Sequence, residues 1–232
     1  MSKHDKAVLA GVLVFLAPFF LIPSVYNGFV NVTNEHAFIM SGVKFAILAT
    51  FGEVLGQRIR IGSWSLTGFG VIPKMVVWFI LGTMIKAAFV IFSVGDPVLL
   101  KKFIDSPSPL VIAFSISMGL NLIFAPIFMT LHKITDLHIA DHKGALVALI
   151  KPINMAQKFS QIDWQVQYGF VFKKSIPFFW IPAHTITFML PSNFQVLFAA
   201  SLGVALGVIL AIAGGQNKPQ KLDVKPETEV AA

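Results

Sequence analysis

The chain has 232 residues, of which 56% are hydrophobic and only 12% are charged, and its mean hydropathy is +0.77. A soluble domain carries about 25% charged residues and cannot bury this much apolar surface, so the composition excludes a soluble globular protein. The absence of cysteine excludes disulfides, thiolate nucleophiles and cysteine-ligated metals. The formal net charge of +7 indicates the basic cytoplasmic flanks of a membrane protein rather than a nucleic-acid-binding surface.

The first 30 residues begin with a short basic head and continue with an apolar stretch. A secretory signal peptide begins in the same way. No small-x-small cleavage pattern follows the apolar stretch, and Tyr26 and Phe29 extend it. The pattern therefore predicts an uncleaved first membrane span.

Further apolar segments follow in chain order, at 37–57, 70–95, 110–131, 176–190 and 194–213. All but the segment at 176–190 are long enough to cross the hydrocarbon core as one helix. The sequence predicts an all-α, polytopic transmembrane bundle of about six spans in residues 1–215. Residues 216–232 are polar and contain proline, which predicts a disordered tail.

One long polar connection, 132–167, contains leucines and isoleucines at helical spacing beside Lys143, Lys151 and Lys158. This pattern predicts a basic amphipathic helix in the inner headgroup region, either as an anchor or as a lipid-sensing or gating element. When the N-terminus is placed inside, most lysines and arginines fall on the cytoplasmic side. Both termini are therefore predicted to face the cytoplasm.

Ionisable side chains inside membrane spans usually face the bundle interior or an aqueous path. Lys44, Lys86 and His184, with the amide of Asn121, all fall within about 9 to 16 Å of the outer ends of their spans, at 1.5 Å per residue. They are predicted to form one polar layer. Glu53 falls deeper, at the level of Lys74 at the start of the next span, which predicts a structural ion pair.

The two lysines of this layer have no acidic residue at their own depth, which leaves three alternatives. Each lysine extends its stem to the outer headgroups, or both line a wet, positive cavity that faces water or an anion, or they pair with backbone carbonyls. The sequence alone leaves these alternatives open.

The short segment 176–190 contains Pro177 and Pro182, and Pro191 follows it. Proline removes an intrahelical hydrogen bond, and the freed carbonyl must meet protein or water within a membrane. The prolines therefore predict a broken helix that presents His184 and Thr187 to a hydrated core. A threonine at such a place also commonly bonds to the carbonyl four residues earlier, without any further role.

Signatures of enzymes are absent from the sequence. The segment "DLHIADH" (136–142) has metal-ligand residue types, but its spacing matches no standard site. No HExxH, GxSxG, phosphate-loop or dinucleotide-binding pattern occurs. We expect no catalytic residue, no cofactor, no metal and no nucleic-acid partner.

The C-terminal stretch "FFWIPAHTITFMLPSNFQVLFAASLGVALG" resembles the signature of the family of the small peroxisomal membrane protein and the Mpv-type mitochondrial inner-membrane protein. In that signature, Trp-Pro precedes a polar residue, Asn-Phe, a second Pro and an Arg. The matching positions are Trp180, Pro182, His184, Thr187, Phe188, Pro191 and Gln195. The departures are an isoleucine between Trp180 and Pro182, Thr187 in place of Asn, Gln195 in place of Arg and a missing late tryptophan.

Two earlier segments, "FGEVLGQR" and "GVIPKMVVWF", also resemble the family, which extends the likeness over roughly three-quarters of the chain. The resemblance implies a distant member that forms a membrane channel or pore. Four spans are usual in the family, so the predicted six include a re-entrant or interfacial segment if the likeness holds. No Arg- and Ser-rich transit peptide precedes the first span, which favours the bacterial inner membrane over an organellar membrane.

We therefore predict a pore for small, anionic solutes, lined by Lys44, Lys86, Asn121, His184 and Thr187. The alternatives are a secondary transporter whose broken fifth span binds substrate, and a non-transporting scaffold whose polar residues only join helices. The expected partners are the lipid bilayer and a small solute that the sequence does not name. The sequence leaves a homo-oligomer open.

Overall fold

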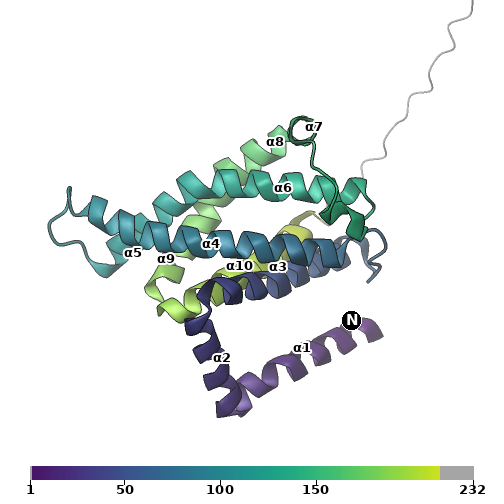
Figure 1. The fold of residues 1–232 in the computed structure, drawn as a ribbon, viewed down its shortest axis with the longest axis horizontal. Helices are drawn as coiled ribbons and strands as arrows, with labels where there is room; N and C mark the ends of the chain where they lie inside the picture. The colour runs from purple at the N-terminus through teal and green to yellow at the C-terminus, as the bar shows by residue number, and fades with distance from the viewer. Residues whose placement is uncertain (1, 215–232) are drawn as a thin grey trace, which may run out of the picture.

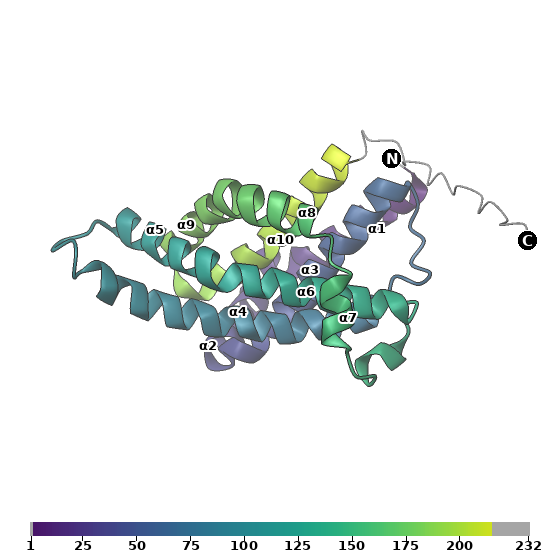
Figure 2. The ribbon, with the colours of Figure 1, turned by 90° about the horizontal axis from the view of Figure 1, so that it is seen from above.

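The computed structural model describes residues 2–214, and the predicted disordered tail, 216–232, lies outside them. Within this described part the regular structure is entirely helical. Five helices are long and apolar enough to cross a membrane: Lys3–Leu21, Ala37–Ile61, Val71–Leu100, Pro109–Asp141 and Ser192–Ile209. The protein is thus an all-α helical bundle whose composition and helix lengths are those of a multi-pass membrane protein (Figures 1 and 2).

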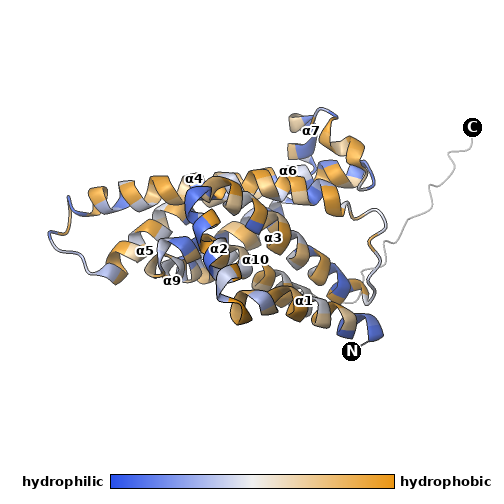
Figure 3. Ribbon diagram, turned by 60° about the horizontal axis from the view of Figure 1, so that its bottom comes forward, coloured by the Kyte–Doolittle hydropathy of each residue, from blue (hydrophilic) through white to orange (hydrophobic). Residues whose placement is uncertain are grey.

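Helix α1 (Lys3–Leu21) lies apart from the bundle and is joined to it through α2 (Pro23–Glu35), which runs in a different direction (Figure 1). The prediction that Tyr26 and Phe29 extend the first span is therefore wrong. Pro23 forces the preceding residue out of the helical region, and Ile22 has extended dihedrals, φ −120° and ψ 101°. The surface of α1 is largely apolar (Figure 3), and none of its residues is buried.

The N-terminal end of α1 is nevertheless attached to the rest of the chain. Asp5 accepts hydrogen bonds from Arg58 Nε at 3.0 Å and from Trp64 Nε1 at 2.8 Å. These partners lie at the end of α3 and in the loop after it. The contact fixes one end of an otherwise unburied helix.

The centre of the bundle consists of α3 (Ala37–Ile61), α4 (Val71–Leu100) and α10 (Ser192–Gly214). Small residues permit their close approach, as is common between membrane helices. A Cβ atom added to Gly52 of α3 would lie 2.9 Å from the Cα of Val204 in α10, and Ser41 of α3 donates to the carbonyl of Gly82 in α4 at 2.6 Å. The backbones of these helices are therefore almost in contact.

The span predicted at 110–131 is longer in the structure. Helix α5 (Pro109–Gly119), the π-helical turns η1 (Leu120–Phe124) and α6 (Ala125–Asp141) form one continuous helical path. Ala125 donates to the carbonyl of Leu120, five residues earlier, just before Pro126. The wide turns accommodate this proline, which has no N–H to donate.

The helix expected around Lys143, Lys151 and Lys158 is not continuous. This segment contains a short 3₁₀-helix (Leu146–Leu149) and the short helix α7 (Met155–Ser160), while the first ten residues of the predicted connection belong to α6. Lys158 is buried and pairs with Asp141 at the end of α6. The segment is thus folded against α6 through an ion pair instead of presenting one basic helical face.

The predicted break at Pro177 and Pro182 does not occur. Helix α8 (Trp164–Val166), the π-helical η3 (Gln167–Trp180) and α9 (Ile181–Met189) follow one another without interruption. The i to i+5 bonds of η3 tolerate the missing N–H of Pro177, and Pro182 lies directly where these wide turns pass into α9. This helical path is long enough to cross a bilayer, at about 1.5 Å per residue.

Pro191 does coincide with a break. It lies between α9 and α10, where Leu190 is extended with ψ 156°. Gln195 donates to the carbonyl of Leu190 at 3.0 Å, which satisfies a backbone group exposed by the break. The first residues of α10 consequently lie near α2 and the start of α3 (Figure 1).

Candidate functional site

A charged cluster joins α3, α4 and α6 at the end of the bundle that the sequence predicts to be cytoplasmic. Lys74 Nζ lies 2.6 Å from Glu53 Oε2 and also donates to Asp136. Trp78 Nε1 donates to Glu53 Oε1 at 2.7 Å. The predicted contact between Glu53 and Lys74 is present, within a larger network than the sequence indicated.

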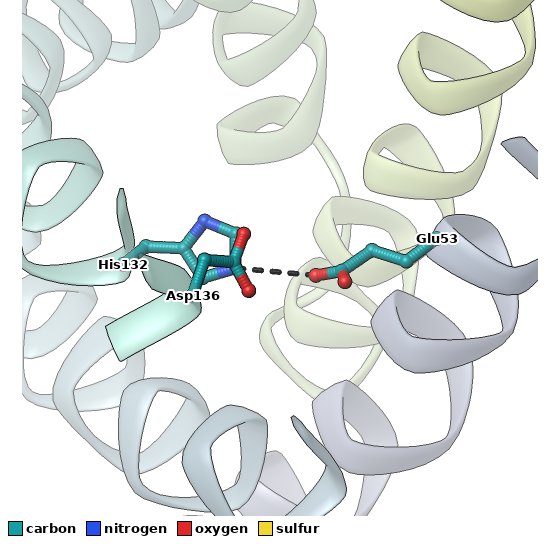
Figure 4. Close-up of side chains that lie close together, drawn as sticks. All are labelled: Glu53, His132 and Asp136. Atoms are coloured by element: carbon teal, nitrogen blue, oxygen red, sulfur yellow. Dashed lines mark hydrogen bonds and ion pairs between the residues drawn. The ribbon is translucent and has the colours of Figure 1, made fainter. Parts of the chain in front are cut away.

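His132 completes this cluster. Its Nε2 lies 3.1 Å from Glu53 Oε1 and 3.8 Å from Asp136 Oδ2, and Figure 4 shows His132 and Asp136 extending from the same helix toward Glu53. The indole of Trp78 lies over the imidazole with ring centroids 4.4 Å apart. Two carboxylates are thus held beside one ammonium and one imidazole.

Glu53, His132 and Asp136 offer three ligand atoms that lie within 4.8 Å of one another. Their types suit a divalent cation. The ammonium of Lys74, however, already donates to both carboxylates. A metal ion would have to displace this internal cation, so the arrangement fits an ion-pair network better than a metal centre.

A cavity of about 480 Å³ extends from this cluster into the bundle. Its walls are mostly apolar and aromatic, with Phe45, Phe89 and Phe128 among the lining residues, and small residues of α3 and α10 form one side. Arg60 and Asp136 border the cavity at the cluster end, and Asn121 and His184 border it farther along. The cavity volume lies within the range of pockets that hold small molecules.

Two of the predicted polar residues, Asn121 and His184, are in direct contact. The amide of Asn121 lies 3.0 Å from His184 Nδ1, and Ser117 donates to the carbonyl of Ile181 at 2.7 Å. His184 is also stacked against Trp180, with ring centroids 5.2 Å apart. These bonds join α5 and η1 to α9 within the membrane region.

Thr187, which the sequence assigned to the pore lining, borders neither cavity described here. It is fully buried, and its hydroxyl donates to the carbonyl of Ala183, four residues earlier, at 2.9 Å. This is the local bond that threonine commonly makes in membrane helices. Its environment is therefore that of a packing residue.

Lys44 and Lys86 line a second cavity, of about 180 Å³. The other lining residues are Thr33, Asn34, Ala37, Ser192, Asn193 and Val196. Lys44 is only 5% exposed, donates to Thr33 Oγ1 at 3.1 Å and lies over the ring of Phe29. Within the described residues neither lysine makes an ion pair.

The predicted layer of four polar residues is thus divided between two cavities. Val196 borders the second cavity and belongs to the same buried apolar cluster as Phe45 and Phe89, which border the main cavity. This cluster therefore contributes to the walls of both spaces. The main cavity lies toward the cluster of Glu53 and Lys74, and the second lies toward the start of α10.

The sequence missed Trp78, His132 and Asp136 as members of the charged cluster. The available signal was the spacing of His132 and Asp136, which places both on one face of a helix. The apolar run ends at 131, so the sequence predicts a connection at these residues, whereas the helix continues through them to Asp141.

Searches among known proteins found no matching family model, no matching curated protein and no matching solved structure.

Proposed function

We propose that the protein is a membrane conduit for small anionic solutes, as a pore or a transporter. The observation that carries this proposal is a pair of separate cavities that share one buried apolar cluster as part of their walls. A pathway that is closed in its middle has this form, since an apolar constriction excludes water and ions until it widens.

The second cavity supports the preference for anions. It is bordered by two lysines, and none of its lining residues is acidic. Of the three alternatives, a positive cavity fits Lys44 best, because its side chain is buried within the protein and its ammonium contacts Thr33 and Phe29. A buried positive charge raises the local concentration of anions.

The main cavity supports the proposal because it extends from the middle of the bundle toward the predicted cytoplasmic end. It reaches the cluster of Glu53, Lys74 and Asp136, whose ion pairs join three helices. An ion pair across the end of a cavity can act as a second barrier, because it must separate before a solute leaves. The resemblance of the C-terminal segment to a family of membrane channels supports the same class.

A secondary transporter is the second candidate. The uninterrupted helix over 164–189 removes the broken fifth span on which the sequence based this alternative. Two separate cavities still suit alternating access, in which each side opens in turn. We place both termini in the cytoplasm of a bacterial cell, because lysines and arginines gather on that side of the predicted spans.

The test is anion and cation flux with the purified protein in liposomes and planar bilayers. Discrete currents that favour anions support a pore, and electrically silent counterflow supports a transporter. In either case, Lys44→Glu with Lys86→Glu should abolish or invert the anion preference. The control is Lys101→Glu with Lys102→Glu, which makes the same change at exposed positions at the end of α4.

Two results would contradict the proposal. One is the absence of flux from correctly folded protein, which leaves a scaffold. The other is an equal effect of the Lys44 and Lys86 pair and of the control pair on ion preference, since a general surface charge would then explain it.

A further inference from the structure

We propose that the cavity of Lys44 and Lys86 is a binding site for a small divalent oxyanion with the chemistry of sulfate or hydrogenphosphate. This inference rests on the proposed function and specifies the solute that the positive cavity accepts.

The charge of the site is that of two ammonium groups that border one cavity, with Lys44 buried and Lys86 half-buried. Lys44 is 5% exposed, and its ammonium contacts a hydroxyl, Thr33 Oγ1, and an aromatic ring, Phe29. Neither contact supplies a negative charge. Two like charges in a poorly solvated site repel each other, and a dianion would neutralise both at once.

The donors of the site come from four helices. Thr33 and Asn34 belong to α2, the two lysines to α3 and α4, and Ser192 and Asn193 to the first turn of α10. The first N–H groups of a helix have no acceptor within that helix, and they carry the positive end of its dipole. Pro191 breaks the chain just before them and so places this helix end at the cavity.

Such a set of donors favours an oxyanion over a halide. Each oxygen of sulfate or hydrogenphosphate can accept a separate hydrogen bond, and bonds from a charged donor to an anion are the strong ones. A spherical halide gains the charge interaction but uses fewer donors. The hydroxyl of Ser192 and the amides of Asn34 and Asn193 can therefore discriminate between them.

The size of the cavity limits the ligand. A volume of about 180 Å³ corresponds to about six water molecules in the liquid and lies below the roughly 300 Å³ at which pockets for drug-sized ligands begin. An inorganic oxyanion and a few waters fit this space.

The experiment measures equilibrium binding of radiolabelled sulfate to the full-length protein in lipid nanodiscs. We expect saturable binding that hydrogenphosphate competes for and that equal chloride leaves nearly unchanged. Lys44→Gln and Lys86→Gln should each weaken binding at least tenfold, whereas Lys44→Arg, which keeps the charge, should retain most of it. The matched control, Lys101→Gln with Lys102→Gln, should bind as the wild type does.

Several outcomes would overturn the inference: no saturable sulfate binding, equal competition by chloride, or undiminished binding in the Lys44→Gln variant. A folding defect is recognised because Lys44→Arg would then also lose binding and thermal stability. Because binding is measured without flux, the two proposals can fail separately. Sulfate binding without transport would retain this site and reject the conduit, and anion flux without sulfate binding would do the reverse.

Discussion

Removing the ammonium of Lys74 should destabilise the protein strongly. Lys74 is the shared partner of Glu53 and Asp136, and the exposed fractions of these three side chains are only 11%, 22% and 28%. Replacing the lysine by methionine would keep most of its apolar stem and leave two adjacent carboxylates without their cation. Loss of one partner from a buried ion pair costs about 3 to 5 kcal/mol.

A loss of this size corresponds to a lower melting temperature by about 6 to 20 °C for a chain of this length. The assay is thermal unfolding of the purified Lys74→Met variant in detergent, followed by circular dichroism. Lys151→Met, at an exposed position, is the matched control and should shift the melting temperature by no more than a few degrees. A Lys74→Met shift as small as that of the control would refute the structural importance of the cluster.

The second partner of Lys74 changes the expected result of a charge exchange. If Glu53 and Lys74 alone formed the pair, Glu53→Lys with Lys74→Glu would restore most of the lost stability. In the structure, the new glutamate at 74 would face Asp136, so the exchange should restore little. Adding Asp136→Asn to the exchanged protein removes this repulsion and should raise the melting temperature again.

Three further predictions concern packing and topology. Gly52→Ala should lower the melting temperature because the added Cβ would meet the backbone of Val204 at 2.9 Å. Gly203→Ala, next to Val204 but with no atom within 4 Å of the added Cβ, should be almost neutral, and equal effects would contradict the close packing of α3 and α10. Asp5→Asn should weaken the attachment of α1 to Arg58 and speed proteolysis of the loop after α3 in detergent, and an unchanged cleavage rate would contradict that attachment. A tag on the C-terminal tail should resist external protease in intact cells. Digestion of the tag would show that the tail faces outward, opposite to the predicted orientation.

The class of protein could be predicted from local properties of the sequence. Mean hydropathy and the length of apolar runs are properties of contiguous residues, and in a bilayer they require helices, because the backbone groups must bond within their own segment. The same reasoning located Glu53 and Lys74 at one depth. Depth follows from counting residues along the helix axis, so this contact could be expected without knowing which helices pack together.

The prolines were interpreted less well because their effect depends on the turns around them. Pro177 and Pro182 predict a break if the helix keeps its usual hydrogen-bond pattern. The structure instead widens the turns over Gln167–Trp180, and the helix continues. Ser117 of α5 donates to the carbonyl of Ile181 directly after these turns, so the continued helix is bonded to a neighbouring one.

The division of the polar layer was decided only by the tertiary structure. Lys44 and Phe45 are adjacent in the sequence, yet Lys44 lines the second cavity and Phe45 lines the main one. Successive side chains of an α-helix point about 100° apart, since one turn takes 3.6 residues. The position of a residue along its span determines how deep it lies in the bilayer. Which cavity its side chain lines depends on the neighbouring helices, and these are placed only by the tertiary structure.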